Sequence, residues 1–565
     1  MAEREWTPDQ KNAIEARGGT LLVSAAAGSG KTAVLVERVV QRLLDPINGC
    51  DADRLLVVTF TKAAAAEMRE RISAALSARL AARPDDARLL RQQMLLPCAA
   101  ICTIDSFCND LVRENFHRLD LAPDYKILDA GELTLLRSEA MDIAMEEFYQ
   151  KGDPAFTELL ELVRKGRDDA ELTETVSRLY DYTQAYPFPE EWIQHARALC
   201  RADLPEQENP WMAEIRAYLA QALAFAQHTA QSACALLETE PALCEKYAPA
   251  FDSDLNALTR VQAALTGGWD ALCDALNAIS FVRMPNAPRE YANSPIKAAA
   301  KESRDRVKDT VKKMQESLCA NAAENAEDMA YLAPLLNQLF DLTLRFSEEF
   351  TRLKRGRHAA DFSDIEHMAL SLLVERKGGT LCRSPLAQEL SARYEEILVD
   401  EYQDTNEAQD LLFRMLSREE SNLFLVGDVK QSIYRFRQAM PEIFLHRRDR
   451  LPPYVRGNYP ARITLGRNFR SRKGVTGMVN FLFRQLMSRQ LGEMEYTQEE
   501  ALVPAAPYPE RQDPDCEIHL LDAGDKGDDS AAVYEARYIA AHINRLLREG
   551  LTVQDGGKAR PARRK

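Results

Sequence analysis

Between residues 20 and 128, short apolar runs alternate with longer amphipathic stretches. The short runs TLLVSA, RLLVVTFT and AAICTID have the length of strands, and KTAVLVERVVQRLL, AAAAEMRERISAAL and SFCNDLVREN have the length of helices. Continuous apolar runs are typical of strands that are buried on both faces. Alternation of such strands with helices predicts a doubly wound parallel sheet, so we predict an α/β fold here.

The pattern changes between residues 129 and 350. This part consists of long helical stretches rich in Ala and Leu, with few runs of β-branched residues. Pro and Asn residues at 187–189, 209–210 and 285–288 divide it into pieces. We predict an all-helical insertion. Its charged segment 301–313 should form a solvated helix face, with a contact to DNA as the alternative.

Strand–helix alternation resumes near residue 361. EEILVDE and LFLVGD predict two more buried strands with a helix between them. After residue 462, RITLGRNFRS predicts a strand and a helix, CEIHLLDA a strand, and AAVYEARYIAAHINRLLREG a helix. The basic end GGKARPARRK predicts no regular structure. We therefore expect residues 1–128 and 351–461 to form one domain, 129–350 to be inserted into it, and 462–565 to begin a second.

The composition is that of a globular protein with several domains. A chain of 565 residues exceeds what one core accommodates, and 46% hydrophobic with 28% charged residues is ordinary for a soluble protein. Apolar runs such as Leu55–Thr59 are much shorter than the ~20 residues of a membrane helix. The N-terminus MAEREWTPDQ has no apolar run behind its charges. We expect no membrane span, no secretory signal and a cytoplasmic protein.

The net charge and the cysteine content limit the kinds of nucleic-acid surface, disulfide and metal site that the chain could have. A net charge of −15 argues against a surface that coats nucleic acid throughout, although a local basic groove remains compatible with DNA binding. The eleven cysteines indicate reduced thiols rather than disulfides. Cys98, Cys102 and Cys108 lie close together in sequence, but their spacing matches no common metal-ligand pattern. Small buried apolar side chains are the simpler interpretation of these three.

The first segment with clear chemistry is AAAGSGKT at residues 25–32, which follows a predicted strand and opens a predicted helix. Lys31 would supply a charge to the β- and γ-phosphates of ATP, and Thr32 a hydroxyl ligand for Mg²⁺. The positive end of the helix adds to this site. Small residues let the loop fold tightly so that its N–H groups face the phosphates: Ala25, Ala26, Ala27, Gly28, Ser29 and Gly30. Ala25 stands where the motif usually has Gly, but this outer position needs only a small residue. A chance glycine-rich turn is the alternative.

Two acids follow an apolar run in ILVDEYQDTN, residues 397–406. ATP hydrolysis requires a carboxylate for the metal and a group that positions or deprotonates water. Asp400 would hold Mg²⁺ through water, and Glu401 would be the base. A solvated turn is the alternative interpretation of two acids at a strand end.

A third segment, LVGDVKQSIYRFR at residues 425–437, again begins as a strand and ends in polar residues. An amide such as that of Gln431 can sense the γ-phosphate. The side chains of Tyr434, Phe436 and Arg437 can stack on nucleic-acid bases. Taken alone, Tyr434 and Phe436 could equally be aromatic residues of the core.

Seven strings occur in the order seen in UvrD-like superfamily 1 DNA helicases: TPDQ, AAAGSGKT, TFTKAAAAEMRERI, TIDSFC, VDEYQDTN, VGDVKQSIYRFR and NFRS. The chain therefore resembles this family. The resemblance implies a RecA-like P-loop motor domain with a parallel sheet, a large helical accessory insertion, and an incomplete second RecA-like domain. It also implies ATP and Mg²⁺ as cofactors and movement along DNA in the 3′ to 5′ direction.

Within the family, TAVLVERVV, TIDSFC and HAADFSDIE look most like the helicase/nuclease component of a bacterial recombination-repair complex. The resemblance implies a role in double-strand-break repair on single-stranded DNA and duplex ends, together with an AddB-like partner. The alternative is a UvrD-type repair helicase without a nuclease.

The resemblance implies further residue roles. Gln10 resembles a glutamine that reads adenine, with an exposed polar residue as the alternative. Phe469 resembles an aromatic residue that packs on adenine, Arg470 an arginine finger, and Gln431 the γ-phosphate sensor. Asp105 stands where many relatives have His, which weakens a direct phosphate contact at that position. The residues implied to contact DNA are Phe60, Thr61, Lys62, Thr103, Ser106, Tyr434, Phe436 and Arg437.

The later helicase motifs of the family and any nuclease motif do not occur in the sequence. We therefore expect the chain to be the N-terminal part of a longer protein, or a truncated ATP- and DNA-binding product with little activity. Two other classes stay open. A P-loop kinase or GTPase is disfavoured by VGDVKQSIYRFR and NFRS, and a non-catalytic ATP-binding module would bind nucleotide without turnover.

Overall fold

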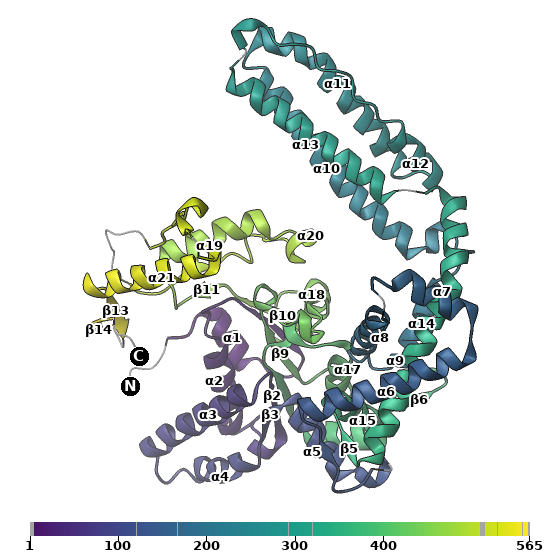
Figure 1. Ribbon diagram of the computed structural model, residues 1–565. Coiled ribbons are helices and arrows are strands. Elements are labelled where there is room, and N and C mark those ends of the chain that lie inside the picture. Colours follow the sequence, from purple (N-terminus) through teal and green to yellow (C-terminus); the bar gives the residue numbers. More distant parts are fainter. Residues whose placement is uncertain are drawn as a thin grey trace. The chain divides into compact units, whose positions relative to one another are not determined.

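The computed structural model describes residues 5–119, 121–166, 168–291, 293–318, 320–508, 515–527, 529–555 and 558–562 (Figure 1). The chain divides into two compact units. The terminal unit combines Met1–Ala13, Val23–Leu35 and Ile463–Lys565, and the main unit combines Ile14–Leu22 with Val36–Arg462. The loop at residues 25–32 thus groups with the last hundred residues of the chain, a grouping that the order of elements along the sequence did not indicate.

A six-stranded sheet forms the α/β part, with the order β10-β1-β9-β8-β2-β3. The pairings β9–β8, β8–β2 and β2–β3 are parallel. Every residue of β1, β2, β8 and β9 is buried, as expected for strands that are covered on both faces. The predicted α/β fold with a parallel sheet is confirmed. The strands are β1 Leu21–Ala25, β2 Leu55–Thr59, β3 Ala100–Thr103, β8 Glu396–Val399, β9 Leu423–Gly427 and β10 Ala461–Leu465.

Polar side chains cap several helices of this α/β part. Thr61 caps α3, Thr103 caps α5 and Asn406 caps α17, each by accepting a backbone N–H with its side chain. These caps fix polar side chains at the end of the sheet where the strands terminate. The helices are α1 Pro8–Glu15, α2 Lys31–Leu44, α3 Lys62–Ala82, α4 Ala87–Leu95, α5 Ile104–Glu114, α15 Phe362–Leu373, α16 Pro385–Arg393, α17 Glu407–Leu416 and α18 Pro441–Arg450.

Residues 130–356 are built from long helices with two large core clusters and a small third one around Ile193, Cys200 and Phe340. One large core joins α6, α7 and α8 to α14, and the other joins α10, α11, α12 and α13. In the second group α10 packs along both α11 and α13, which form an elongated bundle (Figure 1). The helices are α6 Ala130–Lys151, α7 Pro154–Val163, α8 Ala170–Thr183, α9 Pro189–Leu199, α10 Pro210–Leu237, α11 Pro241–Ala264, α12 Trp269–Asn277, α13 Pro295–Ser317 and α14 Ala322–Gly356.

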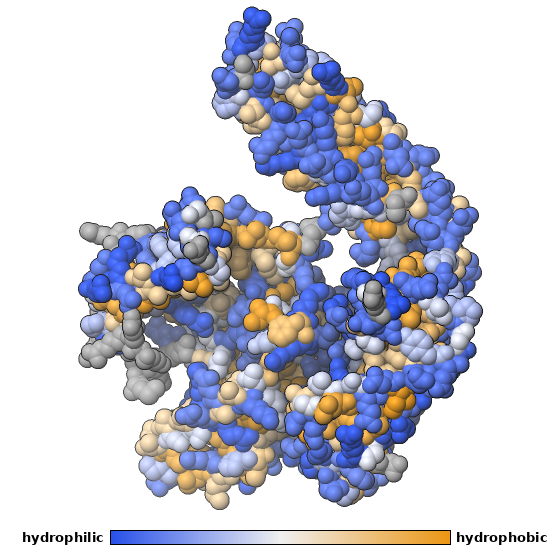
Figure 2. All heavy atoms as spheres, viewed as in Figure 1, coloured by the Kyte–Doolittle hydropathy of each residue, from blue (hydrophilic) through white to orange (hydrophobic). Residues whose placement is uncertain are grey.

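The charged segment of α13 differs from the prediction at one position. Figure 2 shows this bundle as mainly hydrophilic on the visible face, with hydrophobic residues gathered toward α11 and α12. Arg304, however, is only 1% exposed. It forms two bonds with Asp254, at 2.6 Å from Nε and 3.0 Å from Nη2, and it donates to the Val282 carbonyl at 2.7 Å. The solvated-face prediction is wrong for Arg304, because a buried carboxylate satisfies its charge.

Short elements complete the chain. In the main unit, β4 Lys126–Ile127 pairs with β5 Ala359–Ala360, and β6 Val374–Lys377 forms a hairpin with β7 Thr380–Arg383. In the terminal unit, β11 Arg467–Asn468 pairs with β12 Val503–Pro504. The other α-helices and strands that follow β10 are α19 Lys473–Leu486, α20 Arg489–Gly492, α21 Ala531–Arg548, β13 Thr552–Asp555 and β14 Lys558–Pro561.

Two predictions near the end of the chain are wrong. The segment CEIHLLDA contains no strand, and its Ile518 and Leu520 are 75% and 92% exposed. A strand needs a neighbour that supplies hydrogen bonds, and in the described part of the chain no strand pairs with this segment. The basic end also contains structure, because β14 pairs with β13. Residues 556–557 and 563–565 of that end lie outside the described residues.

The described residues contain neither a helix that could span a membrane nor a disulfide. None of the described helices combines the length and the apolar character that crossing a bilayer requires. Ten of the eleven cysteines are described, and all ten are free thiols. Cys98 is exposed, Cys102 half-buried and Cys108 buried, and among the described residues these three do not form a group that could hold a metal.

Candidate nucleotide and nucleic-acid sites

The loop at residues 25–32 connects β1 to α2 in a conformation that requires glycine. Gly28 and Gly30 have φ angles of 70° and 84°, which side chains rarely allow. The helix begins at Lys31, so its first N–H groups and the positive end of its dipole belong to this loop. Lys31 and Thr32 are both half-buried. The backbone geometry is that of an anion-binding loop.

A buried hydroxyl in this loop supports an anionic ligand. Ser29 is 1% exposed, and its Oγ has no hydrogen-bond partner among the described residues. Leaving a buried polar group unsatisfied costs about 1–3 kcal/mol, so such groups usually have a ligand or water to bind. A phosphate oxygen would accept a hydrogen bond from this hydroxyl. The residues of the loop therefore fit a nucleotide phosphate.

Gln10 lies on α1 and contacts the same loop. Its side chain is buried, at 3% exposure, so the alternative of an exposed polar residue is wrong. Its Nε2 donates to the Ser29 carbonyl at 2.9 Å, and its Oε1 accepts the Thr7 N–H at 3.0 Å. The amide thus ties α1 to the loop. Recognition of adenine by Gln10 stays a prediction.

The NFRS segment packs directly on the loop. Asn468 Nδ2 donates to the Ala27 carbonyl at 2.7 Å, and the Phe469 N–H donates to the Gly28 carbonyl at 2.9 Å. A Cβ atom on Gly28 would lie 2.8 Å from Asn468 Nδ2 and 2.9 Å from Arg470 Cβ. Gly28 is therefore required for this close approach as well as for its φ angle.

Asn468 also orients the residues that follow it. Its Oδ1 accepts the N–H groups of Arg470 at 2.9 Å and Ser471 at 2.8 Å, while the side chain is buried. Arg470 itself is exposed. Sequence reasoning selected Phe469 and Arg470 but missed Asn468, whose only signal was its place directly before them.

In the main unit, β8 leads into Asp400 and Glu401. The Asp400 N–H donates to the Val58 carbonyl at 2.9 Å, which continues the pairing with β2. Glu401 has φ 54° and ψ 41°, a left-handed conformation that non-glycine residues adopt at a cost of about 1–3 kcal/mol and mostly at functional sites. Both acids are half-buried. The strain and the partial burial favour the catalytic prediction over a solvated turn.

The next strand, β9, ends beside a set of polar residues that includes Gln431. Asp428 is 1% exposed and accepts bonds from Gln431 Nε2 at 2.6 Å and from Lys430 Nζ at 2.8 Å. The predicted sensor amide is therefore fixed to a buried carboxylate. Sequence reasoning did not select Asp428 or Gln403, which connects Asp428 to Glu401.

Three rings and one guanidinium lie together near these residues, and we name Phe60, Tyr434, Phe436 and Arg437 the aromatic group. The rings of Phe60 and Tyr434 have centroids 4.6 Å apart, and those of Tyr434 and Phe436 are 5.9 Å apart. Arg437 Cζ lies 5.4 Å from the Tyr434 centroid. Phe436 is 75% exposed, so the alternative that it belongs to the core is wrong. Phe60 and Tyr434 are half-buried. Rings that are at least partly exposed beside a guanidinium suit base stacking.

Some of the other side chains that were predicted to contact DNA already form hydrogen bonds within the protein. The hydroxyl of Thr61 accepts the Ala64 N–H at 3.1 Å, and that of Thr103 accepts the Ser106 N–H at 3.2 Å. Thr103 is also buried. Lys62 is exposed at the start of α3. Contact of Thr61, Lys62, Thr103 and Ser106 with DNA stays a prediction.

Asp105 lies close to the cations of this surface. Burial raises the pKa of its carboxyl, while the charges of Lys62 and Arg437 act in the opposite direction. An acid held among these cations reduces their attraction for phosphate. The geometry agrees with the interpretation that Asp105 does not itself contact a phosphate.

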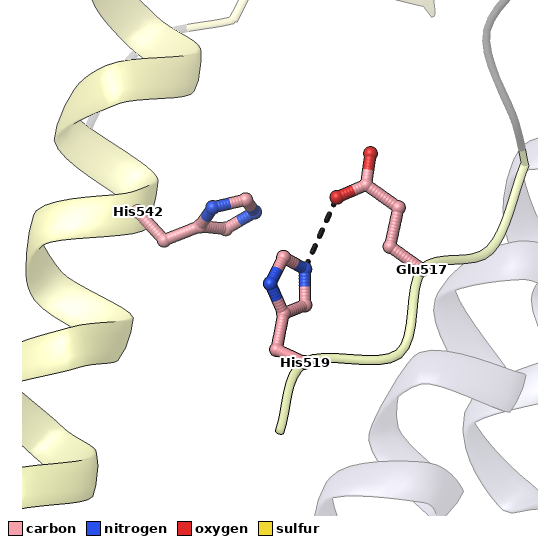
Figure 3. A group of neighbouring side chains, drawn as sticks. All are labelled: Glu517, His519 and His542. Carbon is pink, nitrogen blue, oxygen red and sulfur yellow. Dashed lines mark ion pairs between the residues drawn. The ribbon is translucent and has the colours of Figure 1, made fainter. Parts of the chain in front are cut away.

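Among the described residues of the terminal unit, one group of side chains could hold a metal by residue type. The ligand atoms of Glu517, His519 and His542 lie within 4.8 Å of one another (Figure 3). His519 Nε2 pairs with Glu517 at 3.1 Å, and its Nδ1 bonds to the Tyr538 hydroxyl at 2.6 Å. The guanidinium of Arg545 bonds to His542 Nδ1 at 3.0 Å. A bound cation would be opposed by this guanidinium, so hydrogen bonding within the protein explains the group.

Comparison with known proteins agrees with this geometry. Residues 6–452 match the model of the UvrD/REP helicase N-terminal domain. The chain is 40% identical over 523 residues to the A subunit of the ATP-dependent helicase/nuclease of Moorella thermoacetica, covering 90% of this chain and 37% of that protein. It is 38% identical over 581 residues to the protein of the same name in Geobacillus kaustophilus, covering 100% of this chain and 46% of that protein. The chain thus spans less than half the length of these relatives.

Proposed function

The chain belongs to the UvrD/REP helicase family, and on that premise we propose that it is the ATP-driven motor of a DNA helicase. The observation that carries this proposal is the 25–32 loop, with glycines at positive φ, a helix start at Lys31 and a buried hydroxyl that lacks a bond to any described residue. Membership of this family also argues against a P-loop kinase or a GTPase.

The nucleotide site would be RecA-like. Lys31 and Thr32 would hold the phosphates and Mg²⁺, and Asp400 would hold the metal through water. Bound ATP–Mg²⁺ supplies a phosphoryl group that water can attack. Membership of the UvrD/REP helicase family supports the assignment of both strand ends to one nucleotide.

The protein's own residues would then carry the cycle. Glu401 would take the proton of the attacking water, and Gln431 would respond to the γ-phosphate. Arg470, oriented by Asn468, would neutralise the developing charge. Gln10 and Phe469 would hold the adenine.

The aromatic group would form part of the DNA track. Stacking on Phe60, Tyr434 and Phe436 is tolerant of sequence and worth about 1–3 kcal/mol per base, so bases can be held and released in each cycle. Arg437 adds a charge and a planar surface for stacking. By family resemblance, movement is 3′ to 5′.

The names of the relatives support a more specific role. We propose that the chain is the helicase part of an AddA-type helicase/nuclease, which acts in recombination and double-strand-break repair. Single-stranded DNA and duplex ends would be its substrates, an AddB-like protein its partner, and the cytoplasm its compartment. Residues 129–350 would be an accessory domain, and residues 462–565 would begin a second RecA-like domain.

ATP hydrolysis with and without single-stranded DNA tests the proposal. We expect basal hydrolysis to rise several-fold when oligo(dT) is added. Lys31→Ala should abolish both activities and weaken binding of a fluorescent ATP analogue, because a charge on the phosphates is lost. Equal nucleotide affinity in wild type and Lys31→Ala would refute the assignment of the loop. Hydrolysis that ignores DNA would refute the motor.

A further inference from the structure

The side chain of Gln403 lies between the two catalytic segments of the main unit and is only 1% exposed. Its Oε1 accepts the Asp428 N–H at 2.9 Å. Its Nε2 donates to Glu401 Oε2 at 3.0 Å and to Asp404 Oδ2 at 3.0 Å. The amide oxygen thus accepts one hydrogen bond and the amide nitrogen donates two. These three bonds fix the orientation of the amide, because a flipped amide could not form them.

The hydrogen bonds continue from Asp428 toward the aromatic group. Asp428 accepts from Gln431 Nε2 at 2.6 Å, and residues 429–431 and 435–437 form two short 3-10 helices. Tyr434 lies between these helices and stacks with Phe60. A path of hydrogen bonds therefore runs from Glu401 through Gln403 and Asp428 to the segment that carries Tyr434.

Packing leaves this path little freedom. A Cβ atom on Gly427 would lie 2.5 Å from Gln403 Oε1 and 2.9 Å from a ring atom of Phe444. The strand end is therefore in direct contact with the amide. A second link joins the same segments, since the Ser432 hydroxyl donates to Asp404 Oδ1 at 3.3 Å. In a close-packed contact of this kind, displacement of one segment must displace the other.

We propose that Gln403 is a positioning residue that couples the state of the nucleotide at Glu401 to the affinity of the aromatic group for single-stranded DNA. This inference rests on the proposed function of both sites. A change in the position of the Glu401 carboxylate moves the amide, and the amide moves Asp428 and the segment after it. Coupling of this kind is reciprocal, so DNA must change the affinity for nucleotide by the same factor.

Equilibrium binding tests the proposal without requiring turnover. The dissociation constant of fluorescent oligo(dT) is measured with Mg²⁺–ADP and with a non-hydrolysable ATP analogue, and the ratio of the two is the coupling factor. For the wild type we expect a factor of about 5 or more, the lower end of the range for allosteric coupling. Gln403→Glu keeps the acceptor for the Asp428 N–H but loses both donors and faces two carboxylates. Its coupling factor should fall to near 1 while it still binds both ligands.

Two further variants separate coupling from stability. Gln403→Met keeps the volume but removes all three bonds without adding charge, and it should also lose coupling. Gln92→Glu is the matched control. Gln92 is equally buried, and its amide likewise accepts a backbone N–H, from Ala52 at 2.9 Å, and donates to a carboxylate, Asp51 at 2.7 Å. Gln92→Glu should keep the wild-type factor even if it melts at a lower temperature.

The possible outcomes distinguish failure of the proposed function from failure of the proposed coupling by Gln403. If the wild type binds neither nucleotide nor DNA, the proposed function fails. If the wild type is coupled and either folded Gln403 variant keeps the same factor, Gln403 does not couple the sites. The same conclusion follows if the wild type binds both ligands with a factor of 1. Loss of coupling in Gln92→Glu as well would assign the effect to general destabilisation.

Discussion

At Glu401, an unusual backbone conformation coincides with a proposed catalytic side chain. A left-handed conformation at a glutamate persists only where the surrounding structure imposes it. Here the Glu401 N–H donates to Asp400 Oδ1 at 3.1 Å, and its carboxylate accepts from Gln403. These bonds fix the carboxylate beside the buried amide.

Glu401→Gln should bind ATP normally but hydrolyse it slowly. The amide keeps the shape of the side chain but cannot take a proton, and loss of a general base typically costs roughly 10²–10⁴-fold in rate. Single-turnover hydrolysis with saturating ATP measures the effect. Glu407→Gln, which changes an exposed acid on α17, is the control and should leave the rate unchanged. Near-normal turnover in Glu401→Gln would remove Glu401 from the role of base.

Glu366 gives a prediction for pH dependence. Burial raises the pKa of its carboxyl from 4.5 to about 8, Asp105 adds to the rise, and a bond from Gln409 Nε2 opposes it. Between these two pH values Glu366 is protonated in the folded protein and ionised in the unfolded one, so unfolding releases a proton. The contribution of Glu366 to the free energy of unfolding is therefore fully present below pH 4.5 and is lost as the pH rises through 8.

Thermal melting between pH 5 and pH 8.5 should therefore show stability that declines with pH, by at most about 1.4 kcal/mol per pH unit for one proton. Glu366→Gln should remove this part of the decline, because an amide does not titrate and can still pair with Gln409. Parallel pH curves for the two proteins would mean that Glu366 does not titrate as its burial indicates.

At the scale of elements, the bundle of α10 to α13 depends on the buried pair of Arg304 and Asp254. Removing one member leaves an uncompensated charge in the core, which typically costs about 3–5 kcal/mol. Arg304→Met should therefore destabilise the bundle by about this amount in urea unfolding. The double variant with Asp254→Leu should recover most of the loss, because no buried charge remains.

The neighbouring Arg306 provides the comparison. Its pair with Glu302 is exposed on the same helix, and exposed pairs contribute about 0–1 kcal/mol. Arg306→Ala should thus change the unfolding midpoint little. Equal effects of the two arginine substitutions would show that burial of Arg304 does not determine its contribution.

The segment after β9 supplies the second prediction at this scale. Tyr434→Ala together with Phe436→Ala should weaken binding of oligo(dT) by roughly 5- to 150-fold for each stacked base that is lost. Binding of nucleotide should be unchanged, because the rings do not belong to the 25–32 loop. Fluorescence anisotropy measures the DNA affinity. Phe362→Ala, at another half-exposed ring on α15, is the control, and equal DNA affinities in all three proteins would exclude the rings from the DNA track.

At the scale of the whole molecule, the grouping of the chain follows contacts rather than sequence order. Residues 25–32 are separated by more than 400 positions from Asn468, yet both belong to the terminal unit, and an Asn468 bond joins them. The linear pattern predicted a functional role for the loop, and the family resemblance predicted one for the NFRS segment. It did not show that the first packs on the carbonyls of the second, because a side-chain amide carries no local signal of its partner.

The net charge is −15, but only the fold determines where the charged side chains lie. Many acids pair with arginines, as Glu396 does with the buried Arg38, whose Nε lies 3.0 Å from Glu396 Oε1. Arg437, which belongs to the aromatic group, and Lys62, two residues after Phe60, by contrast remain exposed. An acidic protein can therefore still offer a cationic, aromatic surface to DNA.

The sequence by itself determined the features that depend on neighbours in the chain. Apolar runs specified the buried strands, and Gly28, Gly30 and the helix start at Lys31 specified the loop, because φ preference and helix capping act over a few residues. The same local reasoning failed for CEIHLLDA, since a strand also requires a partner.

Only the tertiary structure decided which distant groups meet. The bonds of Gln403 to Asp428, of Arg304 to Asp254 and of Asn468 to Ala27 span 25, 50 and 441 positions. Burial makes each of these bonds necessary, because a polar group removed from water must find a partner within the protein. Which polar groups are buried, and which partners they meet, depends on the packed interior and cannot be read from a pattern along the chain.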